Sequence, residues 1–153
     1  MKSASLFKTS VIAFGIALVT YIAFFSCDRH LRLHRGAWVV TFAVETNGQP
    51  AIIVNQPVLR VTNLRIVLGG EKTTNTPGTV TFNIPEQPVP FGRVKFEDLT
   101  YLPGTVTLDL FGHEIELLPR TLIVNRKERP WQSETNIELS PADKVPGLTE
   151  PNR

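Results

Sequence analysis

The hydrophobic positions at the start of the chain form one apolar stretch, which runs from Thr9 to Cys27 without a charged residue. As a helix, at about 1.5 Å per residue, this stretch would be roughly 28 Å long, close to the hydrocarbon thickness of a bilayer. The pattern predicts a transmembrane helix over residues 9–27. A short basic tail (1–8) precedes it, and a basic juxtamembrane stem (28–35) follows it.

After the stem the hydrophobic period changes from helical to alternating. In the first such segment Trp38, Val40 and Phe42 fall on one face of a strand, and Thr41 falls on the other. Further strands are expected in the segments 51–55, 58–68, 79–84, 93–102, 106–110, 115–117 and 121–125. Seven or eight short strands without an amphipathic helix predict an all-β domain over residues 36–129, with an antiparallel β-sandwich or a barrel-like fold.

Three local features refine this reading of the strands. Asn47-Gly48 is a strong hairpin signal because both residues tolerate a positive φ. The alternation slips within the segment 58–68, and a bulge near Thr62-Asn63 would restore a single inward face. In the segment 93–102, Val94 and Phe96 are expected to point inward, with a change of phase at Glu97-Asp98.

A proline-rich segment follows the fourth expected strand. Pro85, Pro88 and Pro90 make it extended and rigid, and they remove donors that a sheet would need. It would cross from one sheet to the other or form an edge that resists aggregation. These prolines and the neighbouring Phe91 are candidate partner-binding residues.

The C-terminal segment, residues 130–153, is rich in proline and mildly acidic. Its apolar residues are too sparse to form a core of their own, so we expect an extended tail that is disordered or ordered by a partner. Trp131 and Ile137 could dock on the sheet, and Trp131 is also a candidate partner-binding residue.

Charge and cysteine content exclude some classes of function. Residues 36–129 contain nine Lys or Arg and nine Asp or Glu, interspersed along the sequence. A balanced surface of this kind does not indicate a nucleic-acid partner. Cys27 is the only cysteine, so an intramolecular disulfide is excluded.

The N-terminal apolar segment has three interpretations. A cleaved secretory signal requires small residues at the recognition positions, and Phe24 or Phe25 occupies one of them in every plausible register. A lipoprotein would be cleaved before Cys27, where the same two phenylalanines are bulky. The interpretation that fits best is an uncleaved signal-anchor, a permanent single-pass helix.

The orientation of this helix is not decided by charge counts. Lys2 and Lys8 precede the apolar stretch, while Arg29, Arg32 and Arg35 follow it. A very short basic N-terminal tail is typical of signal-anchors, which keep the amino terminus in the cytoplasm. We therefore expect a location in the cell inner membrane, with the β domain on the periplasmic or extracytoplasmic side.

The ends of the apolar stretch suggest membrane-interface residues. Arg29, Arg32 and Arg35 can reach lipid phosphates from the stem, while Tyr21 and Phe25 suit an interfacial aromatic belt. Membrane lipids are accordingly one expected partner.

The stem also contains a weak metal-ligand pattern. Cys27, His30 and His34 fall on one face of a helix, and these are donors for zinc, copper or haem iron. Two or three ligands do not close a tetrahedral site, and His113 is far along the chain. A basic collar at the membrane surface is the interpretation we favour, so no metal or cofactor is expected.

The β domain contains no convincing catalytic set. Glu97 and Asp98 are adjacent in a strand and would point to opposite faces. Asp109 and Glu116 could pair across a hairpin with His113 at its tip, but no nucleophile accompanies them. We expect no catalytic residue and no enzymatic activity.

Three hypotheses about function remain, all compatible with an architecture that resembles many bacterial envelope proteins. The first is a non-enzymatic accessory or structural subunit of a larger bacterial-type membrane protein complex, in contact with other integral membrane subunits. The second is an envelope carrier or sensor that binds lipid or another apolar ligand in a β-sandwich groove. The third is a metal or haem redox subunit that uses the stem.

Overall fold

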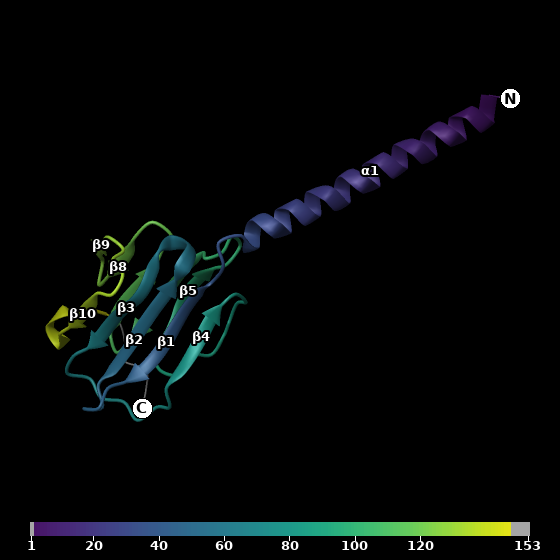
Figure 1. Cartoon of the computed structure of the whole chain (residues 1–153). Helices are drawn as coiled ribbons and strands as arrows, with labels where there is room; N and C mark the ends of the chain where they lie inside the picture. Colours follow the sequence, from purple (N-terminus) through teal and green to yellow (C-terminus); the bar gives the residue numbers. More distant parts are fainter. Residues whose placement is uncertain (1, 148–153) are drawn as a thin grey trace. The chain divides into compact units, whose positions relative to one another are not determined.

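Figure 1 shows the computed structural model of the chain, which describes residues 2–147 and their side chains, except the side chains of residues 2–5, 32 and 33. The chain divides into two units, Met1–His34 and Arg35–Arg153. The first unit is helical and the second is built from strands, and each is described by itself.

Helix α1 (Lys2–Leu33) contains 32 residues and continues from the apolar stretch through the stem. Within it, Leu6–Leu31 is long and apolar enough to cross a bilayer. Its large apolar side chains are exposed; Phe14 and Phe24, for example, have exposed fractions of 71% and 74%. The expected apolar helix is therefore present, and it is longer than the predicted residues 9–27.

The second unit is a β-sandwich of two five-stranded sheets, as the alternating pattern predicts. Sheet A contains, in spatial order, β10 (Asn136–Leu139), β3 (Val61–Leu68), β2 (Pro50–Gln56), β1 (Trp38–Val44) and β4 (Gly78–Phe82). Sheet B contains β5 (Arg93–Asp98), β6 (Thr105–Leu110), β7 (His113–Leu117), β8 (Leu122–Val124) and β9 (Lys127–Arg129). Two 3₁₀ turns, η1 (Pro57–Leu59) and η2 (Pro141–Asp143), complete the unit. Figure 1 shows the labelled strands of sheet A side by side.

One apolar core joins the inner faces of the two sheets. Alternate residues of each strand enter it because successive side chains of a strand point to opposite faces. The largest side chains with no exposed surface include Trp38, Phe42 and Phe82 from sheet A and Leu108 and Ile115 from sheet B. Each of the eight segments predicted as strands overlaps an observed strand, β1 to β8. The strands β9 and β10 were not predicted.

The predicted bulge near Thr62-Asn63 is confirmed. The pairing of β2 with β3 shifts by one residue in this region, and Asn63 has a φ of 50°. The phase change in β5 was predicted at the wrong place. It occurs at Lys95, which is the extra residue between Val94 and Phe96, and it turns Phe96 outward to an exposed fraction of 56%.

The described part of the C-terminal segment, residues 130–147, differs from the extended tail expected from its composition, and residues 148–153 lie outside the described residues. Residues 136–139 form β10, which pairs with β3 in parallel. The close approach depends on Gly69, because a Cβ there would lie 2.8 Å from the carbonyl oxygen of Leu139. The apolar residues Ile137, Leu139 and Val145 are buried, and they supply the free energy that orders this segment on its own domain.

Candidate interaction surfaces

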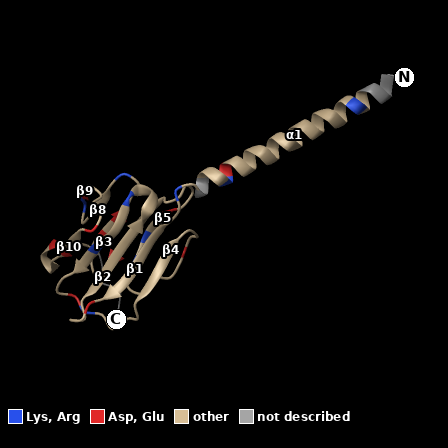
Figure 2. Ribbon diagram, viewed as in Figure 1, with Lys and Arg blue, Asp and Glu red and all other residues tan. Residues whose placement is uncertain are grey.

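The two sheets differ sharply in charge. The strands of sheet A contain two charged residues, Arg65 and Glu138. The strands of sheet B contain ten: Arg93, Lys95, Glu97, Asp98, Asp109, Glu114, Glu116, Lys127, Glu128 and Arg129. The domain is balanced as a whole, but its charges are concentrated on one sheet, and sheet A appears mostly tan in Figure 2.

The outer face of sheet A is composed mainly of small and uncharged side chains. Its central row runs from Thr79 through Thr41 and Ile53 to Arg65, as the strand register requires. The hydroxyls of Thr41 and Thr79 lie 3.0 Å apart. The flanking rows contain Val39, Ala43, Asn55 and Thr81, together with Ala51 and Val67, which are buried. Such a face has few charges to oppose contact with another protein.

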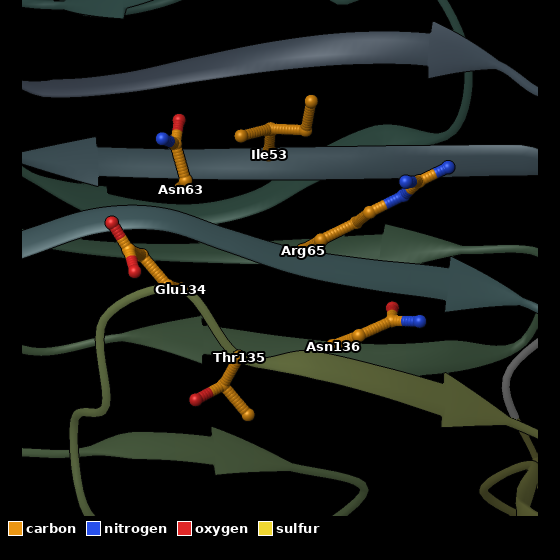
Figure 3. A pocket seen from close by; sticks show the side chains of 6 residues that line it. All are labelled: Ile53, Asn63, Arg65, Glu134, Thr135 and Asn136. Atoms are coloured by element: carbon orange, nitrogen blue, oxygen red, sulfur yellow. The ribbon is translucent and has the colours of Figure 1, made fainter.

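An open hollow lies at the β3–β10 side of this face. It is lined by side chains from β2, from β3, from the start of β10 and from the chain that enters β10, as Figure 3 shows: Ile53, Asn63, Arg65, Glu134, Thr135 and Asn136. Arg65 forms an ion pair with Glu45. The hollow therefore combines one apolar side chain with amide, hydroxyl and charged groups.

The proline-rich candidates occupy the edge of sheet A beside β4. Pro85 and Pro88 are exposed, and Pro90 is half-buried. The side chain of Gln87 donates a hydrogen bond of 2.9 Å to the carbonyl oxygen of Thr81, so the edge is partly covered. A partner role for these prolines stays a prediction.

The two aromatic partner candidates pack in or against the core of the domain. Phe91 has an exposed fraction of 3%, and its ring meets that of Phe42 edge to face at 5.0 Å. Trp131 is half-buried, with its ring 5.0 Å from Trp38, and it donates a hydrogen bond to the carbonyl oxygen of Leu118. Both side chains therefore contribute to packing within the domain.

The outer face of sheet B contains a row of paired charges. Asp109 accepts hydrogen bonds from Arg93, and Glu114 forms an ion pair with Lys95. The Asp109 side chain has no exposed surface, although it points away from the core. The prediction that Asp109 pairs with Glu116 across the hairpin is wrong. The register places Asp109 opposite Glu114 and Glu116 opposite Thr107.

His113 was expected at the tip of a hairpin, where a histidine side chain is usually solvated, and the structure buries it completely. The amide oxygen of Asn125 accepts the Glu114 N–H, which leaves the amide nitrogen to donate to His113 Nδ1 at 3.0 Å. Nδ1 therefore accepts, and the proton of the neutral ring is on Nε2. Nε2 is buried without a hydrogen-bond partner among the described residues.

The C-terminal segment covers this histidine. The Val145 N–H donates to the carbonyl oxygen of Gly112 at 3.1 Å, and Lys144 pairs with Glu71 at 2.7 Å. Burial lowers the pKa of His113, and the nearby Lys144 lowers it further, while Glu71 and Asp143 oppose the shift. Among the described residues, no group of metal-ligating side chains includes the imidazole, which packs as a neutral group.

We expect the stability of the β domain to fall when the pH decreases through the ordinary pKa of histidine. Below about pH 6.5 the unfolded chain binds a proton at His113 that the folded chain resists, so the free energy of unfolding decreases by at most about 1.4 kcal/mol per pH unit. Urea denaturation between pH 5 and pH 8 measures the slope. A His113→Asn variant should flatten it, and an unchanged slope in that variant would assign the dependence to other groups.

The predicted membrane-interface residues lie on α1 or directly after it. Tyr21, Phe25, Arg29 and Arg35 are exposed, and the side chain of Arg32 is outside the described residues. Their contact with lipid stays a prediction.

The stem residues with metal-ligand chemistry are also on α1. The rings of His30 and His34 stand perpendicular, with centroids 5.8 Å apart, and Cys27 is exposed. Over the described part of the chain, no three His, Cys, Asp or Glu side chains gather as a metal-binding group.

No protein-family model, curated protein or solved structure matches the chain. The function proposed below therefore depends on the fold and on its surfaces.

Proposed function

We propose that the protein is a non-enzymatic, membrane-anchored accessory or structural subunit of a larger membrane protein complex. In this proposal α1 is a permanent single span of the inner membrane, and the β domain makes protein contacts on the extracytoplasmic side. The observation that carries it is the difference between the two outer faces. Sheet B presents charged side chains to water, whereas sheet A presents a broad face with very few charges.

Physical chemistry supports a partner on sheet A. The centres of protein interfaces are depleted in charged residues. The central row of Thr79, Thr41 and Ile53 has this character. A helix with exposed apolar side chains along its length would likewise be covered, by lipid or by neighbouring helices.

A matched pair of charge substitutions tests the proposal. Ile53→Glu places a carboxylate on the outer face of sheet A, directly opposite Arg65 in the register. Ile123→Lys places an ammonium on sheet B between Glu116 and Glu128. Each isoleucine is half-buried on an outer face, and each new charge faces an opposite charge, so both variants should fold.

The measurement is quantitative mass spectrometry of proteins that copurify with the full-length chain after gentle detergent extraction. Removing the new carboxylate from water in an interface costs several kcal/mol, and Arg65 can offset only part of this cost because it already pairs with Glu45. Ile53→Glu should therefore reduce recovery of the bound subunit more than about tenfold. Ile123→Lys should leave recovery unchanged. Equal recovery with both variants, or no stoichiometric companion of the unaltered chain, would contradict the proposal.

A further inference from the structure

One end of the sandwich contains the entry point of the chain into the β domain. β1 begins there at Trp38, and the ladder places Phe82, the last residue of β4, beside it. Trp38 Nε1 donates a hydrogen bond to the carbonyl oxygen of Gly104 at 3.0 Å. The ring of Trp131 packs against that of Trp38, and its Nε1 donates a hydrogen bond to the carbonyl oxygen of Leu118. We call this end the tether end and define it by four loops: 57–60, 83–86, 99–104 and 118–121.

The side chain of Gln56 fixes the incoming chain at the tether end. Its amide nitrogen lies 3.0 Å, 3.0 Å and 3.1 Å from the carbonyl oxygens of Arg35, Gly36 and Ala37, respectively. Gln56 itself has an exposed fraction of 1%. The residues directly after α1 are therefore held at this end by a buried amide.

Exposed apolar side chains are concentrated at the tether end. Among the described residues of the β unit, four large apolar side chains have more than half of their surface exposed: Val58, Ile84, Phe96 and Tyr101. Val58, Ile84 and Tyr101 lie in tether-end loops, and Phe96 is on the outer face of sheet B. The loops at the opposite end, including 45–49 and 69–77, present polar tips.

The three apolar tips are held by rigid chain. Val58 lies in η1, where its N–H donates to the Gln56 side chain at 3.0 Å. Each tip has a proline within two residues, which limits the conformations of its loop: Pro57, Pro85 and Pro103. Because the tips are already ordered, burying them would require little loss of conformational entropy.

Exposed arginines lie in or next to the tether-end loops. Arg35, Arg60, Arg120 and Arg129 are exposed at or beside the tether-end loops, together with three exposed carboxylates: Glu86, Asp98 and Glu134. Arginine binds phosphate through paired hydrogen bonds. Apolar tips among arginines match the chemistry of a lipid headgroup layer, which has phosphates above and acyl chains below.

The covalent tether permits this contact. α1 ends at Leu33 and β1 begins at Trp38, so the residues between them extend over at most about 17 Å. If α1 spans a bilayer, the tether end cannot be farther than that from the end of the helix. The polar loops at the opposite end have no such restriction.

We propose that Val58, Ile84 and Tyr101 insert into the lipid headgroup layer and hold the tether end of the β domain against the membrane. This inference depends on the proposed anchoring by α1. It leaves the outer face of sheet A free to meet a protein partner. The occupant of the tether end is thus the surface of a lipid bilayer.

Lipid-borne quenching of fluorescence in the full-length chain tests the insertion. Cys27→Ser removes the only native cysteine. Single cysteines are then introduced and labelled at Arg120, near the tips, and at Thr46 and Thr74, at the opposite end. The protein is reconstituted into phosphatidylcholine–phosphatidylglycerol vesicles that contain lipids with a nitroxide on the headgroup. The label at position 120 should be quenched at least about twofold, whereas labels at positions 46 and 74 should keep their intensity.

Matched variants assign the effect to the tips. The triple replacement Val58→Ser, Ile84→Ser, Tyr101→Ser should abolish quenching at position 120, and Phe96→Ser should leave it unchanged. These side chains are exposed, so circular dichroism should confirm that both variants fold.

The outcomes separate this inference from the anchoring proposal. Failure of the protein to float with vesicles would contradict anchoring itself. Flotation without quenching at position 120, or equal quenching at both ends, would overturn the insertion alone. The insertion would also be overturned if the fluorescence of the label at position 120 changed only after reconstitution with an extract of native membrane proteins, because the tips would then face protein.

Discussion

Replacing Phe42 with alanine should lower the free energy of unfolding of the β domain by about 3–5 kcal/mol, the range for removing a phenylalanine from a close-packed core. Phe42 has no exposed surface, and its ring contacts Phe91 edge to face at 5.0 Å. A natural domain has a total stability of about 5–15 kcal/mol. The Phe42→Ala variant should therefore retain only part of its stability and unfold at much lower urea concentration.

Phe96→Ala is the matched control, because it is the same substitution in a strand of the opposite sheet. Phe96 has an exposed fraction of 56%, so its removal should change stability by no more than about 0.5 kcal/mol. Both tryptophans of the chain, Trp38 and Trp131, are in the β unit, and their fluorescence reports its unfolding in urea. Similar losses in the two variants would mean that Phe96 points inward.

This pair of phenylalanines also shows where sequence reasoning succeeds and fails. Phe42 lies within an unbroken alternation, which assigns its face without further information. Phe96 follows a bulge at Lys95, and one extra residue reverses the face of every position after it. The slip near Thr62-Asn63 was visible because apolar residues mark both sides of it. In β5 the apolar residues Val94 and Phe96 flank Lys95 with the spacing of a regular alternation, which conceals the extra residue.

The buried state of His113 could not be predicted from its neighbours in the sequence. It depends on Lys144 and Val145, more than thirty positions away, and on β10, which pairs in parallel with β3. Long-range pairing of this kind leaves no periodic signal in a short segment. The nearest clue was the spacing of Ile137 and Leu139, which alternate as strand residues do.

The charge difference between the sheets likewise required the topology. The composition of the β domain gives equal numbers of acidic and basic residues, which excluded a nucleic-acid surface but indicated nothing about faces. Only the strand order reveals that the uncharged β1, β2 and β4 lie together in sheet A. The tether end could not be predicted from the sequence either, because its four loops come from distant parts of the chain.

The two single substitutions that remove one partner of the Arg93–Asp109 ion pair on sheet B should lower the stability of the β domain by different amounts. Arg93→Leu leaves the carboxylate of Asp109, whose side chain has no exposed surface, without its only cationic partner in the described structure. We expect a loss of about 3 kcal/mol, the lower end of the range for breaking a buried pair, since the arginine side chain is 53% exposed and water can replace part of it. Asp109→Leu instead leaves a half-exposed guanidinium that water can solvate, so its loss should be about 1 kcal/mol or less.

The double variant Arg93→Leu, Asp109→Leu separates the cost of an unpaired charge from the value of the pair. Asp109 Oδ1 has no hydrogen-bond partner among the described residues, so the carboxylate is only partly satisfied even in the unaltered protein. Replacing both groups with apolar side chains should restore stability to within about 1 kcal/mol of the unaltered protein, because well-packed hydrophobic residues often match or exceed a buried ion pair. The double-mutant cycle, measured by urea denaturation at pH 7, would then give a coupling of about 2–3 kcal/mol. Additive losses would show that the two side chains act independently and that Arg93 does not neutralise the buried carboxylate.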